Sequence, residues 1–198
     1  MRDLTQVCSE AEKGEPMPHN VMLDLETLGT RPGCSILSIG AVHFDPYSGK
    51  LGPEFYEVVN RKSCSAKGLE EDPETIAWWD RQSPQARELL KEVEDCPQGL
   101  GGALVKLTGW LQQFGKRELY VWGCGADFDQ PILAACYRVT SMPLPWMWWN
   151  NRCFRTLRAL GNLKGEPPRL GVYHNALDDA KTQAMQAINV VQKLGLKI

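Results

Sequence analysis

Residues 20–60 read NVMLDLETLGTRPGCSILSIGAVHFDPYSGKLGPEFYEVVN, and this stretch decides the fold. Within residues 20–26, apolar side chains occupy every second position, which is the period of a strand. Two further apolar runs cover residues 35–44 and 54–60, and the turn-forming residues 45–50 (DPYSGK) lie between them. The stretch therefore predicts a three-stranded antiparallel meander.

Helices and short strands are expected after the meander. The expected helices cover residues 75–80, 84–93, 101–114, 127–139, 152–160 and 175–193, and the expected strands cover residues 118–122 and 146–149. A proline directly follows Asp72 and Ser83, which is typical of a helix start because the first helical N–H has no partner within the helix. The order of elements predicts an α/β fold, in which parallel strands extend the meander into a mixed sheet flanked by helices. We expect residues 1–17 to be a flexible N-terminal leader and residues 18–198 to be a single domain.

The composition narrows the class of protein. The 198 residues include 22 Lys and Arg against 24 Asp and Glu, and the net charge of −2 argues against binding nucleic acid by bulk positive charge. No apolar run reaches about 18 residues, and the first 20 residues contain no apolar segment, so we expect neither a membrane-spanning helix nor a secretory signal. The seven scattered cysteines form no Cys-x-x-Cys pair, which favours reduced thiols in the cytosol.

Acidic residues recur in pairs at three points of the chain. The pairs are Asp24 and Glu26 in the first strand, Asp127 and Asp129 after the strand at 118–122, and Asp178 and Asp179 in the last helix. Taken singly, each pair is explained by a solvated strand face or by helix capping. Residues two apart in a strand share a face, however, and like charges there repel unless a cation or a proton lies between them. Helical periodicity leaves open which of Asp178 and Asp179 faces a site, and His174 precedes this helix on a loop, where we expect it to be exposed.

The order of these motifs resembles that of the DEDDh 3′→5′ exonucleases, which have a ribonuclease H-like fold. The motifs are Asp-x-Glu-Thr near the start, Phe-Asp in the middle and His-x-Ala-x-x-Asp in the last helix. A closer resemblance, over about residues 20–195, is to exonucleases of bacteriophages and prophages of the bacteriophage exonuclease A type. The strings that carry it are LDLETLG, ILSIGAVHFDP, TIAWWDRQSPQAR, WGCGADFDQPIL, FRTL and HNALDDA.

This resemblance implies a role for each motif residue. It assigns Asp24, Glu26, Asp129 and Asp179 to two Mg²⁺ or Mn²⁺ ions, and the family spacing of five residues from the histidine selects the second aspartate of the last pair. Hard divalent ions prefer oxygen ligands, so a carboxylate cluster suits them. The same resemblance makes His174 the general base, a role that suits an imidazole whose ordinary pKa is near 6.5.

The resemblance also implies how the substrate is held. It places the residues just after the first motif against the 3′-terminal nucleotide and suggests a functional wall around Trp78 and Trp79. Because neighbouring helical residues point about 100° apart, we expect one of these rings to be buried and the other to stack on bases. The predicted substrate contacts are Thr27, Leu28, Phe128, Trp79 and Gln82.

The helix expected at residues 152–160 is amphipathic. Its apolar side has Phe154, Leu157 and Leu160, and its other side has three arginines. These arginines either contact phosphates or are simply solvated. Trp110 and Trp122 are expected in the core.

The predicted function is a two-metal-ion 3′→5′ exonuclease that releases nucleoside 5′-monophosphates from the 3′ ends of single-stranded DNA or RNA. One alternative is a ribonuclease H-like endonuclease, which lacks the His-x-Ala-x-x-Asp spacing. Another is a catalytically silent nucleic-acid-binding module, which has no need of mutually repelling acids. The four motif carboxylates exceed the net charge of −2, so the rest of the chain has a small excess of positive charge. We therefore expect nucleic acid to bind locally at the cleft, with few phosphate contacts. The resemblance further implies the cytoplasm of a bacterial host, if the chain is phage or prophage encoded, with no membrane partner, and it leaves a homodimer open.

Overall fold

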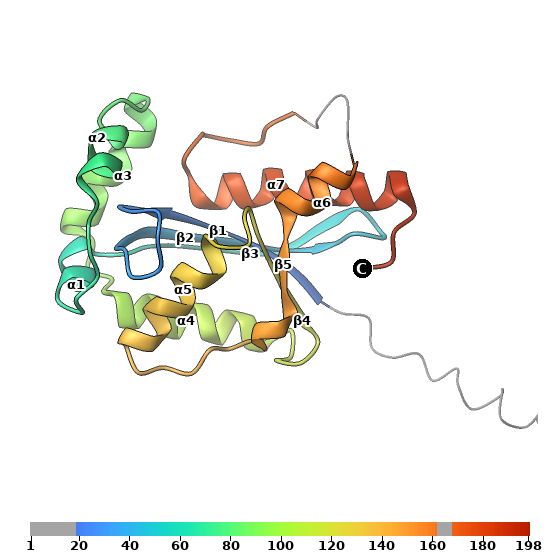
Figure 1. The fold of residues 1–198 in the computed structure, drawn as a ribbon, viewed down its shortest axis with the longest axis horizontal. Coiled ribbons are helices and arrows are strands. Elements are labelled where there is room, and N and C mark those ends of the chain that lie inside the picture. The colour runs from blue at the N-terminus through green and yellow to red at the C-terminus, as the bar shows by residue number, and fades with distance from the viewer. Residues whose placement is uncertain (1–18, 162–167) are drawn as a thin grey trace, which may run out of the picture.

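A five-stranded mixed sheet forms the centre of the computed structural model, which describes residues 19–161 and 168–198 (Figure 1). Its strands are β1 (His19–Thr27), β2 (Ile36–Asp45), β3 (Lys50–Val58), β4 (Leu119–Gly123) and β5 (Asn151–Cys153). The spatial order is β3-β2-β1-β4-β5, with antiparallel pairing through the first three strands and parallel pairing of β4 with β1 and of β5 with β4. The predicted meander and mixed sheet are confirmed, whereas the expected leader, residues 1–17, lies outside the described residues.

Helices cover both faces of the sheet. They are α1 (Arg61–Ser65), α2 (Pro73–Trp79), α3 (Pro84–Asp95), α4 (Leu100–Gln112), α5 (Asp129–Val139), α6 (Phe154–Gly161) and α7 (Ala176–Leu194), with a 3₁₀ turn η1 (Trp148–Asn150) before β5. In Figure 1, α6 and α7 lie above the sheet, α4 and α5 lie below it, and α1, α2 and α3 stand at one end. The side chains of Asp72 and Ser83 cap α2 and α3, as the proline pattern predicts.

The alternation in β1 divides its side chains between the two faces. Val21, Leu23 and Leu25 belong to the core between the sheet and helices α4 and α5, whereas Met22 belongs to the core between the sheet and helices α6 and α7. Residues at even positions of β1 therefore face α7, and the acidic residues of the strand continue that row beyond the apolar core. Helix α7, which covers this row, begins close to Asp24 and Glu26.

Gly40 of β2 determines how closely α7 approaches the sheet. Gly40 pairs with Asp24 across β1 and β2, and a Cβ atom at Gly40 would overlap the backbone of Ala176, the first residue of α7. Only a glycine lets the helix start in direct contact with the strand. The N-terminus of α7 therefore lies at the level of Asp24.

Three expectations about elements are wrong. The segment 146–149, which was expected to be a strand, is instead a loop that continues into η1. Trp146 is buried in this loop, and its indole N–H donates a 2.8 Å hydrogen bond to the side chain of Asn151. The helix expected from residue 152 begins at Phe154, and its Leu160 is 70% exposed rather than packed. The short helix α1 was not expected from the sequence.

The six described cysteines are free, as expected. Within the described ranges, every helix is too short or too polar to cross a bilayer.

Candidate active site

An open cleft of about 720 Å³ lies where the C-terminal end of β1 meets the N-termini of α5 and α7. The cleft is lined by all five residues with predicted catalytic roles: Asp24, Glu26, Asp129, His174 and Asp179. They come from three elements and one loop that are far apart in the sequence. The lining does not include Asp127, which is exposed, or Asp178.

Asp24 and Glu26 project from β1 on the side of α7, as their spacing predicts. Asp24 accepts a 2.7 Å hydrogen bond from the amide of Gln183, which lies one helical turn after Asp179 on α7. Glu26 is only 7% exposed and has no comparable donor among the described hydrogen bonds of the site. The strand thus brings two carboxylates under the beginning of the last helix.

Asp129 is held by backbone N–H groups at the start of α5. Its two carboxylate oxygens accept hydrogen bonds from the N–H of Leu25 in β1 over 3.2 Å and from that of Cys124 over 2.8 Å. A Cβ atom at Gly123 would lie 2.8 Å from the Asp129 carboxylate, so this glycine leaves the space that the carboxylate fills. Asp129 is therefore buried at the edge where β1 and β4 end.

The first turn of α7 separates the roles of its two aspartates. Asp178 turns back to accept a hydrogen bond of 2.7 Å from the N–H of Val172. Asp179 faces the cleft, accepts a 3.0 Å hydrogen bond from the N–H of His174 and forms an ion pair with Arg169. The position left open by helical periodicity is therefore filled by Asp179.

His174 lies in a half-buried position, in contrast to the exposed one expected from its loop. Its ring packs edge-on against the rings of Trp78 and Trp79, with centroids 4.9 and 5.9 Å away, and its φ of 63° lies in the left-handed region. Burial lowers the pKa of the imidazole, and Arg169 lowers it further, whereas Asp179 acts in the opposite direction. Burial therefore favours the neutral form of the imidazole.

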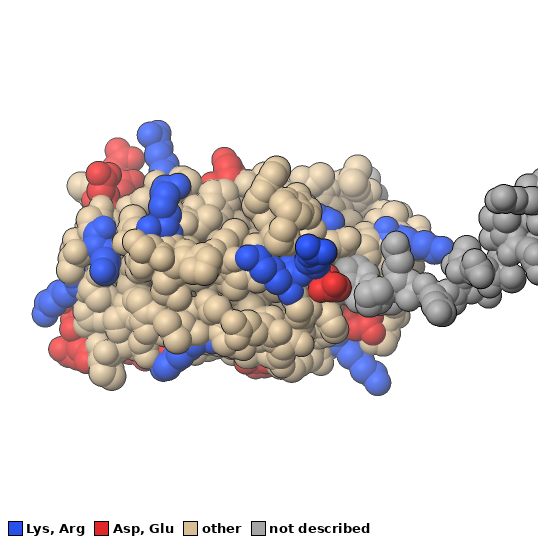
Figure 2. Space-filling view, turned by 90° about the horizontal axis from the view of Figure 1, so that it is seen from below, with Lys and Arg blue, Asp and Glu red and all other residues tan. Residues whose placement is uncertain are grey.

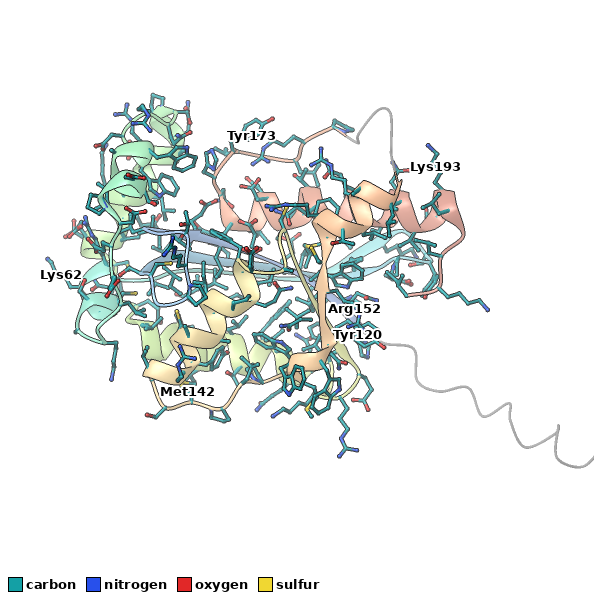
Figure 3. The ribbon with its side chains drawn as sticks, viewed as in Figure 1. Lys62, Tyr120, Met142, Arg152, Tyr173 and Lys193 are labelled. Carbon is teal, nitrogen blue, oxygen red and sulfur yellow. The ribbon has the colours of Figure 1, made fainter. Side chains whose placement is uncertain are left out.

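Arg169 connects the loop before α7 to the cleft. Besides its ion pair with Asp179, its guanidinium donates to the carbonyl oxygen of Val172 over 2.7 Å and stacks 3.7 Å from the ring centroid of Tyr173. Figure 3 shows Tyr173 on this loop, above the first turn of α7. One side chain thus holds both the helix and the segment that precedes His174.

The clustered carboxyl groups resist ionisation. Burial raises the pKa of Glu26 from 4.5 to about 8, with further contributions from the charges of Asp179 and Asp129. Burial also raises the pKa of Asp129 to about 6, and burial together with the neighbouring carboxylates holds the pKa of Asp24 well above its usual range. A divalent cation would remove this penalty because it neutralises the repulsion. Ligand atoms of Glu26, His174 and Asp179 lie within 4.8 Å of one another, so the residues present fit such an ion.

The predicted substrate contacts are only partly at the cleft. Thr27 and Phe128 line it, but Leu28 is 1% exposed and packs in the core beneath α2 and α3. Trp79 is also 1% exposed, and its indole N–H donates to the carbonyl of Thr27 over 2.9 Å. Neither side chain therefore offers a free surface to a substrate in this structure, and the assignments of Leu28 and Trp79 to the substrate stay predictions.

Trp78 is the exposed member of the tryptophan pair. One exposed and one buried ring were expected, because neighbouring helical residues point about 100° apart. It is 38% exposed and lines the cleft. Gln82 lines an adjoining cavity with Tyr173 and His174, and its amide donates to the carbonyl oxygen of Trp78 over 2.9 Å.

Sequence reasoning missed other residues around the cleft. Gln183 follows Asp179 by four positions, so helical spacing could have identified it. Arg169 has no such signal, because its contacts depend on the path of the loop. Of the three arginines that were left open, Arg155 lines the cleft and donates to the carbonyl oxygen of Cys124 over 3.0 Å.

Fold and site together define a 3′→5′ exonuclease of the DEDDh type, and the comparisons with known proteins agree. The family model described as "3'-5' exoribonuclease Rv2179c-like domain" matches residues 19–191, and the chain belongs to this family. The DEDDh class predicted from the sequence motifs is confirmed.

Individual relatives share the fold over most of the chain. A protein of Enterobacteria phage T4 named "Exodeoxyribonuclease" is 25% identical over 157 residues, which is 68% of each chain. The nuclease domain of 3'hExo, a DEDDh family member bound to rAMP, has a TM-score of 0.62 at 14% identity, covering 89% of this chain and 93% of that one. E. coli Exonuclease I in complex with a dT13 oligonucleotide has a TM-score of 0.63 at 15% identity, and the match covers 90% of this chain and 42% of that chain.

Proposed function

We propose that this chain uses two divalent ions, Mg²⁺ or Mn²⁺, to release nucleoside 5′-monophosphates from the 3′ ends of single-stranded DNA or RNA. The observation that carries the proposal is the convergence of four acidic side chains and one imidazole in a single cleft. A binding module would gain nothing from this arrangement, because the buried acids repel one another.

Asp24, Glu26, Asp129 and Asp179 are the residues that would hold the ions. When bound, divalent ions stabilise the charge that develops on the phosphate and lower the pKa of a coordinated water. The protein contributes fixed positions for the ligands. Backbone N–H groups orient Asp129, the Gln183 amide orients Asp24, and the N–H of His174 orients Asp179.

His174 is the proposed general base. Burial favours its neutral imidazole, the form that accepts a proton, and its ring is held against Trp78 and Trp79 beside Glu26 and Asp179. The N–H donated to Asp179 fixes the backbone of the base relative to a proposed ligand. Proton transfer and ion binding would then share one rigid unit.

The proposed substrate contacts are Trp78 and Phe128 for bases and Arg81 and Arg155 for phosphates, since all four line the cleft. Trp78 replaces Trp79 in this role because its ring is exposed. The family description names an exoribonuclease and the phage T4 relative is named an exodeoxyribonuclease, so both nucleic acids are proposed substrates. The relationship to the phage protein also supports the cytoplasm of a bacterial host as the place of action, and a homodimer stays a prediction.

The test incubates the protein with 5′-labelled single-stranded DNA or RNA and Mg²⁺ or Mn²⁺. A ladder that shortens from the 3′ end is expected for the wild type and is expected to vanish in Asp24→Asn. The matched control is Asp127→Asn, since Asp127 is an exposed acid close to the site in sequence that does not line the cleft.

Three outcomes would contradict the proposal. Internal cuts would favour the endonuclease alternative, and binding without cleavage would favour the silent module. Cleavage that survives in Asp24→Asn would remove Asp24 from the mechanism.

A further inference from the structure

Two exposed tryptophans lie outside the cleft, in the turn η1. Trp148 is 70% exposed and Trp149 is 56% exposed, and their rings meet at 83° with centroids 5.5 Å apart. Rings of this size are usually buried in a folded chain, and adjacent exposed ones mark a contact surface. Neither ring contributes to the core or to the cleft.

Arginines lie directly beside these rings. The Arg152 guanidinium stacks 3.9 Å from the centroid of the Tyr120 ring and donates to the carbonyl oxygen of Trp149 over 3.2 Å. The carbonyl oxygen of Arg117 accepts a hydrogen bond of 2.7 Å from the Asn150 amide, which ties the loop before β4 to the same turn. Figure 3 shows Arg152 and Tyr120 together at this edge of the sheet. The tryptophan patch comprises Trp148, Trp149, Tyr120, Arg117 and Arg152.

Positive charge continues around the tryptophan patch. Lys116 precedes Arg117, and both side chains are exposed. Figure 2 shows Lys and Arg side chains spread over the face seen from below, with some Asp and Glu side chains among them. The neighbouring acid, Glu118, is folded back, with its carboxylate over Gly115. The aromatic surface is thus accompanied by cations.

Strand β5 runs from the tryptophan patch to the active site (Figure 1). The patch residue Arg152 lies within β5, and the carbonyl of Arg152 accepts a 2.8 Å hydrogen bond from Gln130 of α5. Three residues further on, Arg155 lines the cleft. The six residue-to-residue steps from Trp149 to Arg155 span at most about 20 Å.

We infer that the tryptophan patch is a second binding site for the single strand, which holds nucleotides on the 5′ side while the 3′ end lies in the cleft. Stacking rings beside cations are the pattern that binds single strands without regard to sequence. Protein interfaces are instead depleted of lysine, whereas the exposed Lys116 accompanies this patch. The inference rests on the proposed function, because it extends the path of that substrate along β5.

Substrate length separates the patch from the cleft. At about 3.4 Å per stacked nucleotide, a span of about 20 Å corresponds to about six nucleotides. A stacked trinucleotide in the cleft is therefore expected to fall short of the patch, whereas a 15-mer is expected to reach it. We expect the double variant Trp148→Ala/Trp149→Ala to raise KM for the 15-mer about tenfold and to leave turnover of the trinucleotide unchanged.

The controls match exposure and charge. Leu160→Ala truncates a side chain of α6 that is as exposed as Trp148. It is expected to change KM for neither the trinucleotide nor the 15-mer. Arg117→Gln is expected to weaken 15-mer binding and make it less dependent on salt, whereas Lys62→Gln, at the far end of the molecule in Figure 3, is not. Trp148→Phe/Trp149→Phe keeps aromatic faces and is expected to retain most of the affinity.

Fluorescence anisotropy of a labelled 15-mer in EDTA measures the patch without catalysis. If the double alanine variant no longer binds the 15-mer, the inference is supported even if the wild-type protein shows no cleavage. Failure of the proposed catalytic function can therefore be told apart from failure of this inference. Equal effects on trinucleotide and 15-mer would overturn the inference, as would unchanged binding. A wild-type dimer that the double variant splits in sedimentation would assign the surface to a second copy and overturn it too.

Discussion

The cleft and the tryptophan patch depart from the usual arrangement of side chains in opposite ways. In the cleft, carboxyl groups that prefer water are buried together, and the pKa of Glu26 rises to about 8. In the patch, Trp148 and Trp149 are exposed although their rings would be more stable in a core. Each arrangement is unfavourable in the free protein, and each matches one part of a proposed ligand set: divalent ions in the cleft and bases on the patch.

The difference between them is their dependence on tertiary structure. The cleft requires three elements to meet within hydrogen-bond distance, whereas the patch lies in one turn and two neighbouring strands. Changes that move an element should therefore abolish activity on every substrate, whereas changes in the patch should affect only long ones.

The largest expected effect comes from Gly40→Ala. The added methyl group overlaps the backbone of Ala176, so α7 must move away from β2 and take Asp179 with it. We expect cleavage of all substrates to be lost and the free energy of unfolding to fall by about 1–3 kcal/mol. Cleavage assays and urea denaturation measure both effects.

Gly109→Ala is the matched control, because a Cβ atom at Gly109 meets nothing within 4 Å in the interior of α4. We expect it to keep full activity and to stabilise the protein by about 0.5–1 kcal/mol. Full activity in Gly40→Ala would show that the contact between α7 and β2 does not position the site.

His174→Gln is expected to lower kcat by about 10²–10⁴-fold for short and long oligonucleotides alike, since it removes the proposed base. Binding of Mn²⁺, measured by isothermal titration calorimetry, should be retained. If Mn²⁺ binding disappears together with activity, His174 acts as a metal ligand and not as a general base.

Arg169→Gln is expected to have a smaller effect, a decrease in kcat of about 10-fold with KM unchanged. The guanidinium positions the His174 loop through Val172 and Tyr173 but lines no part of the cleft itself. Lys193→Gln, near the opposite end of α7 in Figure 3, is the control and should leave kcat unchanged. A rise in KM without a change in kcat would instead place Arg169 among the substrate contacts.

Stability should depend on pH because of the cleft and not because of the patch. A carboxyl group whose pKa is raised by folding stabilises the fold below its unfolded pKa, and this contribution is lost as the pH rises through the folded value. Glu26, at about 8 against an unfolded value near 4.3, falls in this class. Between pH 6.5 and 8.5 in EDTA, Tm is therefore expected to fall by several degrees, and Mg²⁺ should reduce the fall.

Variants from both regions sharpen this measurement. Glu26→Gln should flatten the dependence of Tm on pH in EDTA, whereas the double alanine variant of the patch should keep the wild-type slope. A wild-type Tm that stays constant across the window would show that the buried carboxyl groups ionise without cost.

The sequence predicted the parts of the fold that depend on local period. The alternation in residues 20–26 identified β1 and the shared face of Asp24 and Glu26, and motif spacing selected Asp179, which faces the cleft. Packing between distant segments was beyond such patterns. Trp79 and Leu28 are apolar neighbours of the motifs, and only the packing of α2 and α3 against the sheet shows that both are buried.

The same limit explains the segment before β5. Its aromatic residues have high strand propensity, but Trp146 is buried from a loop by a hydrogen bond to Asn151. Arg169 illustrates the limit in the site itself, because its ion pair depends on a loop that folds back over α7. Local patterns report which face a residue occupies, whereas long-range contacts decide what it meets there.

The contact of α7 with β2 has a consequence for synthesis. Asp24 and its hydrogen-bond partner Gln183 are 159 residues apart, and Asp179 reaches the cleft only when Ala176 is seated on Gly40. A nascent chain on the ribosome therefore has the first two carboxylates but not the last one until the final helix has emerged. The order of translation thus delays assembly of the carboxylate cluster until α7 has been made.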